Sequence, residues 1–399
     1  MKTINSPFTI VDALDISYIG SQADNAGITE NGNYDISSSL KIALGNGNYD
    51  AVVINGTGNI DNNHISFGSG AYDYIYTCNG SITGNTITFG SGGEDYCLTY
   101  NGSIITGNTI SFGSGADDFV YTQNGSITGN TITFGSGAQD YVFTQNGLTG
   151  NTISIGNGDN DSIESITNQI ANNHITMGNG NGDAVLANGL GGNNIINIGS
   201  GLNDVIDVST NDQITVGVGG SDTFYFKQSA LGSIGNVQIT HFNAVNDAIL
   251  VNNHTLYSGF SASYSNGNTI ISNGSGDSIT LVGVNDVANL TSYFHDNSPS
   301  DARLKRSIRL LKELPNGLKL YAFQYFWSQV AYVGLMAQDL LANPQWASAV
   351  ITHPLGFYTV NYAQLGLRMT TLEQWLETGD ASVLFDQAEV KAINESLHD

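Results

Sequence analysis

The stretch Phe89-Gly-Ser-Gly-Gly-Glu-Asp95 recurs as Phe112-Gly-Ser-Gly-Ala-Asp-Asp118 and again as Phe134-Gly-Ser-Gly-Ala-Gln-Asp140. Looser copies give nine units in all, at intervals of 21 to 23 residues except for a shorter last interval. The aspartates that end the units are Asp50, Asp73, Asp95, Asp118, Asp140, Asp161, Asp183, Asp204 and Asp222. A constant period of this length is typical of a protein built from one small unit stacked many times.

The aligned units share columns of one residue type. Every unit has Ile two residues before the apolar residue that opens the phrase, and an apolar residue two positions after the Asp. Seven consecutive units also have Asn four residues before the opening residue, namely Asn63, Asn85, Asn108, Asn130, Asn151, Asn173 and Asn194. In a coiled solenoid each residue stacks on its counterpart about 4.8 Å away in the next coil, so such columns are expected. Buried Asn side chains can hydrogen-bond along the stack.

Short alternating segments of Ile, Thr and Tyr, separated by Gly and Asn-Gly, predict strands and turns. We therefore predict a mostly β protein whose main part is a parallel β-solenoid of about nine 22-residue coils. The expected parts are an N-terminal cap over 1–39, the solenoid repeats over 40–226, a β-rich closing segment over 227–297 and a small α+β domain over 298–399.

The charge pattern supports a domain boundary near Ser300. The net charge is −24, yet residues 1–299 contain only Lys2, Lys41 and Lys227 as basic residues, and the other eight lie beyond Ser300. So acidic a chain is a poor partner for nucleic acid or anionic membranes, and no run of about 18 apolar residues predicts membrane insertion. The N-terminus lacks a basic-then-apolar signal, so an extracellular protein would leave the cell by lysis or by a signal-less route.

The column of nine aspartates is a candidate calcium site. The phrase Gly-x-Gly-x-x-Asp resembles the repeats of secreted RTX proteins, whose pattern has one residue fewer before the Asp. The closest match is Val218-Gly-Gly-Ser-Asp-Thr-Phe-Tyr-Phe226 followed by Ile239-Thr-His-Phe-Asn-Ala-Val-Asn-Asp247. The resemblance implies calcium, since glycine turns can point carbonyls inward and each Asp adds an oxygen ligand. The alternative is an Asp column that is solvated or hydrogen-bonded.

An aromatic face is expected on four consecutive coils. Because the second residue after each Asp is apolar in all nine units, strand alternation turns the first and third residues outward. In these coils the outward residues are Tyr74 and Tyr76, Tyr96 and Leu98, Phe119 and Tyr121, and Tyr141 and Phe143. A contiguous exposed apolar patch is rare on soluble monomers. It indicates either a subunit interface or a platform on which the sugars of a surface glycan receptor stack.

Two carboxylates on the same coils raise the question of glycan cleavage. Glu94 and Asp117 occupy one column of adjacent coils, near the separation that a retaining glycosidase requires. The position precedes the turn Asp and becomes Gln139 in the following coil, which favours an ordinary polar turn residue.

Beyond the repeats, Ser298-Pro-Ser-Asp-Ala-Arg-Leu-Lys-Arg-Ser-Ile-Arg-Leu-Leu311 opens with helix-capping residues and then has Leu304, Ile308 and Leu311 at helical spacing. We therefore predict a helix there. Three further segments follow, and an amphipathic stretch then runs to Leu376. The segments are Leu320-Tyr-Ala-Phe-Gln-Tyr-Phe-Trp327, Tyr332-Val-Gly-Leu-Met-Ala-Gln-Asp339 and Gly356-Phe-Tyr-Thr-Val-Asn-Tyr-Ala-Gln-Leu365.

This order resembles the S74 peptidase family, the intramolecular chaperones at the C-termini of phage tailspikes and tail fibres. Its members begin Ser-Asp-x-x-Leu-Lys. They continue through an aromatic strand, a Val-Gly-Leu-x-Ala-Gln-Asp/Glu segment, a Gly-Tyr/Phe-x-x-Val-Asp/Asn-Tyr turn and a terminal helix. The resemblance covers 298–376 and implies a homotrimer in which this domain guides folding and then cuts itself off.

The resemblance assigns Ser300 as the nucleophile, Lys305 as its base and the bond between Pro299 and Ser300 as the cleavage site. Lys acts as a base only when desolvation lowers its pKa, and we expect burial on trimerisation to do this. Five residues along a helix turn about 140°, so the dyad needs Ser300 outside the helix or a Lys from a neighbouring chain. A plain helix N-cap at Ser300 is the alternative reading.

These features predict an extracellular or virion-tail fibre that attaches to a surface or host. Its only expected enzymatic activity is a single-turnover serine autoproteolysis, with no multiple-turnover reaction. A secreted RTX-like calcium-binding adhesin is the main alternative, and a glycan depolymerase is the less favoured one. Calcium is the one cofactor that the sequence suggests.

Overall fold

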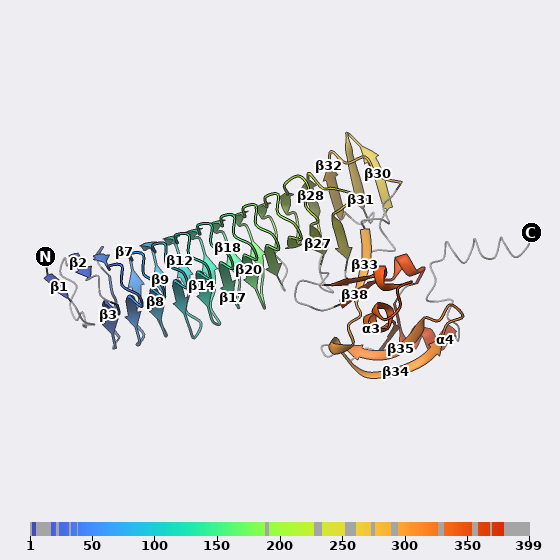
Figure 1. Cartoon of the computed structure of the whole chain (residues 1–399), viewed down its shortest axis with the longest axis horizontal. Coiled ribbons are helices and arrows are strands. Elements are labelled where there is room, and N and C mark those ends of the chain that lie inside the picture. Colours follow the sequence, from blue (N-terminus) through green and yellow to red (C-terminus); the bar gives the residue numbers. More distant parts are fainter. Residues whose placement is uncertain are drawn as a thin grey trace, which may run out of the picture.

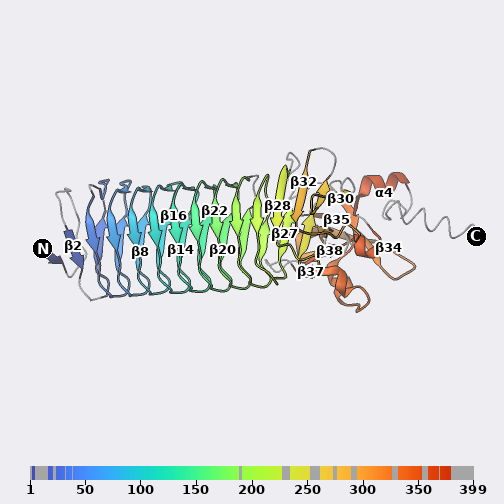
Figure 2. The ribbon, with the colours of Figure 1, turned by 90° about the horizontal axis from the view of Figure 1, so that it is seen from above.

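The computed structural model of the chain describes residues 2–4, 17–20, 24–31, 33–37, 39–187, 191–226, 234–251, 261–272, 276–288, 294–325, 331–352, 358–367 and 369–378. These residues form an elongated rod with a small domain at its C-terminal end (Figure 1). Seen from above, the strands lie side by side across the rod axis (Figure 2).

The rod is a coil of short parallel strands that build three ladders. The parallel part of the first ladder is, in spatial order, β1 (Lys2–Ile4), β2 (Ser17–Gly20), β4 (Lys41–Ala43), β7 (His64–Ser66), β10 (Thr86–Thr88), β13 (Thr109–Ser111), β16 (Thr131–Thr133), β19 (Thr152–Ser154), β22 (His174–Thr176), β24 (Ile195–Asn197), β26 (Gln213–Thr215), β28 (Asn236–Thr240) and β32 (Ser278–Val282). Two more strands, β31 (Asn268–Ser272) and β30 (Ser261–Ser265), follow β32. β31 pairs antiparallel with both β32 and β30.

The second ladder runs along another side of the coil and continues into the C-terminal domain. Its strands are β3 (Gly27–Glu30), β5 (Ala51–Ile54), β8 (Tyr74–Thr77), β11 (Tyr96–Thr99), β14 (Phe119–Thr122), β17 (Tyr141–Thr144), β20 (Ser162–Ser165), β23 (Ala184–Ala187), β25 (Val205–Asp207), β27 (Thr223–Phe226), β29 (Ala248–Val251), β33 (Phe294–Pro299), β38 (Tyr358–Asn361) and β37 (Val350–Thr352). The third and shortest ladder consists of β6 (Ile60–Asp61), β9 (Ile82–Thr83), β12 (Ile105–Thr106), β15 (Ile127–Thr128), β18 (Leu148–Thr149) and β21 (Ile170–Ala171).

Each coil contributes equivalent residues to the interior. Ile87 pairs with Ile65 of the preceding coil and with Ile110 of the following coil, and all three are buried. Phe89 is also buried and stacks on Phe67, with ring centroids 4.7 Å apart. The prediction of a mostly β fold with a parallel β-solenoid is therefore confirmed. Strands β2 and β3 continue the ladders before the nine predicted coils, and β28 and β29 continue them afterwards.

Backbone geometry explains the Gly-x-Gly-x-x-Asp phrase. A Cβ on Gly92 would lie 1.7 Å from the carbonyl oxygen of Gly70 in the preceding coil, so only Gly fits. The residue before the Asp has a positive φ, which is 60° at Glu94, 62° at Asp117 and 64° at Gln139. That left-handed turn disfavours β-branched residues, whereas the same column also holds Tyr49 and Tyr72, with φ of 61° and 63°.

The Asn column forms a buried hydrogen-bonded ladder, as expected. The backbone N–H of Asn85 donates to Asn108 Oδ1 at 2.9 Å, and Asn85 Nδ2 donates to Ile60 O at 2.7 Å. The pattern repeats up to Asn194, whose N–H donates to Asp212 Oδ1. Each buried amide therefore uses both its acceptor and its donor.

The C-terminal domain has its own sheet and core. A four-stranded antiparallel sheet has the order β34 (Lys305–Glu313), β35 (Lys319–Tyr325), β36 (Ala331–Gly334) and β39 (Thr370–Thr371). Two short helices, α3 (Ala337–Leu341) and α4 (Leu372–Thr378), accompany it, with 3₁₀ turns at Ala302–Leu304, Ala347–Ala349 and Ala363–Leu365. Across the described ranges, no helix has the length and hydrophobicity that crossing a membrane requires.

The predicted helix within 298–311 is wrong. Ala302–Leu304 forms a single 3₁₀ turn, and Lys305–Glu313 is a strand that pairs antiparallel with β35. Of the three residues at helical spacing, Leu304 and Leu311 are half-buried and Ile308 is 41% exposed, so the spacing does not mark one buried helical face. Pairing with an aromatic partner strand outweighs the local helix preference, as tertiary context often does.

Candidate functional site

The predicted cleavage site lies where the rod joins the C-terminal domain. Strand β33 pairs in parallel with β29 of the rod and antiparallel with β38 of the domain. The bond between Pro299 and Ser300 follows directly after this shared strand. The N–H of Ser300 donates to Tyr358 O at 3.0 Å, which holds the nitrogen of that bond beside β38.

Ser300 is fully buried in the described structure. Its hydroxyl lies 3.3 Å from the hydroxyl of Tyr362, and its carbonyl accepts a hydrogen bond from Ala337 N–H at 2.8 Å. It precedes the 3₁₀ turn, and the N-cap of that turn is Asp301. The reading of Ser300 as a helix N-cap is therefore wrong.

Asp301 fixes the backbone next to Ser300. Its carboxylate accepts a 2.6 Å bond from Arg303 Nη2, a 2.7 Å bond from Gln338 Nε2 and a 3.1 Å bond from Tyr358 N–H. Burial alone raises the pKa of this carboxyl, but the bonds from Arg303, Gln338 and Tyr358 together hold its pKa well below the usual range. These bonds favour the charged form of Asp301 and hold the turn that follows Ser300.

Lys305 is buried within a single copy of the chain, where it is 4% exposed. Its Nζ donates to Leu335 O at 2.8 Å and lies 3.7 Å from the centroid of the Phe323 ring. Burial lowers the pKa of Lys305 well below its ordinary value, against the opposing charge of Asp301. The expectation that trimerisation buries this lysine is wrong, because residues of the same chain already exclude water. Lys305 therefore does not need a neighbouring chain to remove it from water.

One residue, Leu335, connects the surroundings of Ser300 and Lys305. Its N–H donates to the Tyr362 hydroxyl at 2.7 Å, and its carbonyl accepts from Lys305 Nζ. Within the described chain the Ser300 hydroxyl bonds to Tyr362 rather than to Lys305. Ser300 and Lys305 are therefore linked indirectly: Ser300 contacts Tyr362, Tyr362 binds the Leu335 N–H, and Lys305 binds the Leu335 carbonyl.

The residues after Leu335 also bind the segment that begins at Ser300. Ala337 N–H holds the Ser300 carbonyl, and the Gln338 side chain accepts from Ala302 N–H at 3.0 Å while it donates to Asp301. Sequence reasoning quoted these residues as part of a motif but gave them no role. The available signal was the presence of Gln338 and Tyr362 in the two segments that were quoted as motifs.

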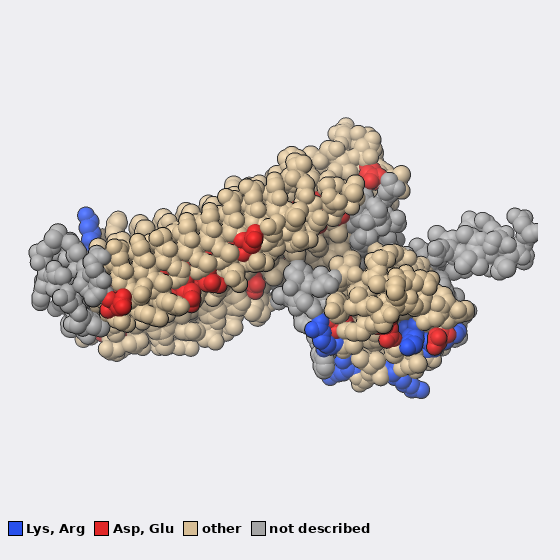
Figure 3. Space-filling model, viewed as in Figure 1, with Lys and Arg blue, Asp and Glu red and all other residues tan. Residues whose placement is uncertain are grey.

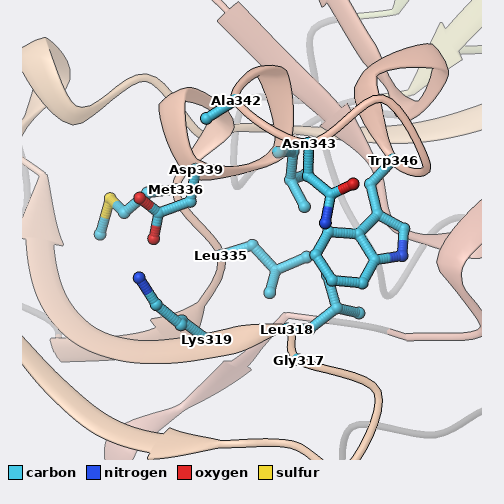
Figure 4. A pocket seen from close by; sticks show the side chains of 10 residues that line it. Gly317, Leu318, Lys319, Leu335, Met336, Asp339, Ala342, Asn343 and Trp346 are labelled. Carbon is cyan, nitrogen blue, oxygen red and sulfur yellow. The ribbon is translucent and has the colours of Figure 1, made fainter.

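Leu335 also lines a cavity of about 210 Å³ (Figure 4). Lys319 and Asp339 point toward each other at one end of it, and Trp346 lies at the other end (Figure 4). Tyr321 donates to Asp339 Oδ2 at 2.5 Å. Movement of Leu335 into this cavity would disturb both bonds that its backbone makes.

The nine predicted aspartates lie inside the rod. Each is at most 1% exposed, so a solvated column is wrong and a hydrogen-bonded column is confirmed. Oδ1 of each Asp accepts the N–H of its counterpart in the preceding coil, for example from Asp95 to Asp118 at 2.9 Å. The series begins at the N–H of Ala26 and ends at Asp247.

The second oxygen of each of these carboxyls is not hydrogen-bonded. Oδ2 of all nine is buried and has no hydrogen-bond partner among the described residues. Burial raises the pKa of these groups, from about 6 at Asp50 to about 8 at Asp140, where the charges of neighbouring aspartates add to the effect. In the ranges that the structure covers, no group of three or more His, Cys, Asp or Glu could hold a metal ion. Calcium binding by this column stays a prediction.

The predicted aromatic face exists, but its rings cover one another. All eight residues are half-buried. Tyr96 stacks on Tyr74 and on Phe119 with centroids 5.0 and 4.8 Å apart, and the stack continues to Tyr141. Because the ring faces are occupied, the interior rings present mainly their edges. This geometry weakens the case for sugar stacking, which needs a bare ring face.

The outward rings of Tyr76, Tyr121 and Phe143 form a second row, which Leu98 interrupts. Tyr100 fills the gap in this row. Tyr100 contacts Tyr76 and Tyr121 edge-on, at 5.7 and 6.1 Å between centroids. Sequence reasoning missed Tyr100 because it lies just beyond the strand positions that were aligned.

Glu94 and Asp117 lie at exposed turn positions of adjacent coils. The hydroxyl of Tyr72 donates to Glu94 Oε1 at 2.7 Å. Both residues have the positive φ that this column requires. The equivalent residues Tyr72 and Gln139 of the neighbouring coils have the same backbone conformation, so Glu94 and Asp117 occupy an ordinary turn position of the repeat.

Lys and Arg gather on the C-terminal domain, whereas Asp and Glu are scattered along the rod (Figure 3). Comparison with known proteins adds no assignment to this geometry. No protein-family model matches the chain, and a search of curated proteins finds no significant match.

Proposed function

We propose that this chain is an extracellular fibre or tailspike-like protein for surface or host attachment. In this proposal the C-terminal domain is an S74-like intramolecular chaperone that trimerises the fibre and releases itself by autoproteolysis. One observation carries the proposal. A buried Ser300 and a buried Lys305 of lowered pKa are held by the same backbone segment, at the strand that joins the two parts. Burying a lysine amine is costly, and such residues concentrate at reactive sites.

The proposed reaction begins when the neutral amine of Lys305 takes the proton of the Ser300 hydroxyl. Ser300 Oγ then forms a bond to the carbonyl carbon of Pro299, the bond from that carbon to the Ser300 nitrogen breaks, and the nitrogen takes up the proton. Water hydrolyses the resulting ester, which leaves a carboxylate on Pro299 and restores the Ser300 hydroxyl. The reaction requires Lys305 Nζ to exchange its bond to Leu335 O for one to Ser300 Oγ. Cleavage occurs once for each chain.

The shape and surface of the protein support a fibre that works outside the cell or in a virion tail. A solenoid of this kind is a stiff rod that grows by adding coils, which suits a spacer between a particle and a surface. Strand β34 is the edge of its sheet and exposes Ile308 and Leu310, as expected if another copy pairs there. A surface glycan is the proposed receptor class.

The second candidate is a secreted RTX-like calcium-binding adhesin. The observation that favours it is the row of buried Asp Oδ2 atoms without hydrogen-bond partners in the described chain. A cation shared by adjacent carboxyls would satisfy them. Calcium-dependent unfolding of the rod would support this reading.

Mass measurement of the purified protein tests the first proposal. Fragments 1–299 and 300–399 should appear in the wild type and be absent in Ser300→Ala and in Lys305→Ala. An intact wild-type chain after complete folding would contradict it.

A further inference from the structure

The hydroxyl of Tyr362 occupies a closely fitted site beside Ser300. Tyr362 is 1% exposed and directly follows β38, which pairs with the strand that ends at the cleavage site. Its hydroxyl lies 3.3 Å from Ser300 Oγ and accepts the N–H of Leu335 at 2.7 Å. Since Leu335 N–H uses one lone pair of the phenol oxygen, the proton and the other lone pair are directed elsewhere, and Ser300 Oγ lies within reach.

Gly334 leaves the room for this hydroxyl. A Cβ at Gly334 would lie 2.4 Å from the Tyr362 hydroxyl oxygen, which is closer than real Cβ atoms come. The nearest other atoms, Met369 Cγ and Tyr362 Cζ, would be at 3.3 and 3.4 Å. The glycine of the Val333-Gly334-Leu335 sequence is therefore required by the tyrosine oxygen.

We infer that Tyr362 is a positioning residue for self-cleavage, and that Gly334 serves the reaction by making room for it. The phenol, fixed by Leu335 N–H, holds the Ser300 hydroxyl in the orientation from which it attacks the Pro299 carbonyl. This role rests on the proposed function. It explains why the segment that carries Gly334 and Leu335 also binds Lys305: one strand end sets the positions of the nucleophile and the base.

The first test is Tyr362→Phe, which keeps the buried ring and removes only the hydroxyl. Full-length chain is purified under denaturing conditions and diluted into buffers of graded pH, and fragment formation is followed by mass. The first-order rate should fall about 100-fold, as expected for a misplaced reacting atom. The pH of half-maximal rate should stay at the wild-type value, because Lys305 remains buried. A purely structural role would instead loosen Leu335, hydrate Lys305 and move that midpoint upward.

The second test is a double-mutant cycle with Gly334→Ala. Alone, this variant should cleave at least as slowly as Tyr362→Phe, because the new methyl group displaces the hydroxyl. In the Tyr362→Phe background it should change the rate less than threefold, because the clashing oxygen is gone. Such non-additivity is the mark of two residues that act through one contact. Thermal unfolding of each variant in a Ser300→Ala background checks that the domain is folded.

The outcomes separate the two claims. A wild-type chain that folds and never cleaves would overturn the proposed function and the role of Tyr362 together. A cleaving wild type with a Tyr362→Phe variant of equal rate, with a shifted midpoint, or with additive losses in the cycle would overturn only the role of Tyr362. If Tyr362→Phe unfolds the domain, a folded and fully active Gly334→Ala variant would still overturn it.

Discussion

The side-chain nitrogen of Lys305 lies 3.7 Å from the centroid of the Phe323 ring, inside a single chain. The ring face and the carbonyl of Leu335 replace the water that an exposed lysine would have. The charged amine loses more solvation than these two contacts return, so the neutral form is favoured. The environment that favours the neutral amine of Lys305 is therefore complete within one chain.

The pH dependence of cleavage should follow Lys305. The rate should rise with pH and level off well below pH 10.5, the ordinary pKa of lysine. Because the folded pKa is depressed, the folded chain binds fewer protons than the unfolded one, and the stability cost of Lys305 is largest at low pH. Lys305→Met should thus be uncleaved and, at low pH, more stable than Ser300→Ala by on the order of 1 to 3 kcal/mol. Parallel curves of unfolding free energy against pH for the two variants would contradict this.

Cleavage should occur within one chain. Because the chain buries Lys305 without a partner, the rate constant should not change when the protein concentration is varied 100-fold. When Ser300→Ala and Lys305→Ala chains are folded together, the chains that keep Ser300 should stay intact. Fragments from such mixtures, detected by mass, would show that a neighbouring chain supplies the base.

The rod should lose stability as the pH rises from about 4 to about 8. Burial raises the folded pKa of each of the nine repeat aspartates to between about 6 and about 8. The stability that their protonated forms contribute is therefore complete below the unfolded pKa and is lost as the pH rises through the folded pKa. Asp118→Asn should raise the free energy of unfolding at pH 8 by on the order of 1 kcal/mol and change it little at pH 4. Asp117→Asn, in the exposed turn beside it, is the matched control. Added calcium that removes the pH dependence in the wild type would favour the adhesin reading.

Release of the domain should need a second step after the bond is cut, namely the separation of β38 from β33. A cut after Pro299 leaves Asn297, Ser298 and Pro299 paired with β38 of the domain. The fragments should therefore elute together in size-exclusion chromatography under native conditions and separate in denaturing gels. Immediate separation in native buffer would mean that β33 leaves β38 when the bond is cut.

Subunit association should depend on the edge strand β34. Replacing Ile308 and Leu310 by Ser in the Ser300→Ala background should shift the mass seen by light scattering from a trimer toward a monomer. Val245→Ser, which changes a 90% exposed residue of the rod, is the control. An unchanged trimer would place the contact elsewhere, and a wild type that is always monomeric would remove the trimer from the proposal.

The sequence by itself determined the solenoid, because its information is periodic. Equivalent residues such as Ile65, Ile87 and Ile110 meet only if consecutive units stack, and strand alternation then decides which neighbours point inward. The Asn column followed from the same argument. The orientation of the aspartates did not, since period alone cannot say whether a turn side chain points to solvent or back to the N–H of the preceding coil.

Only the tertiary structure decided the junction and the C-terminal domain. The spacing of Leu304, Ile308 and Leu311 suited a helix, but antiparallel pairing with β35, which begins six residues after β34 ends, made the segment a strand. Lys305 is desolvated by Phe323 and Leu335, and the Tyr362 hydroxyl occupies the space that a Cβ on Gly334 would need. These contacts join segments that occur once in the sequence, so no repeat pattern predicts which residues come together. Only the folded structure shows them.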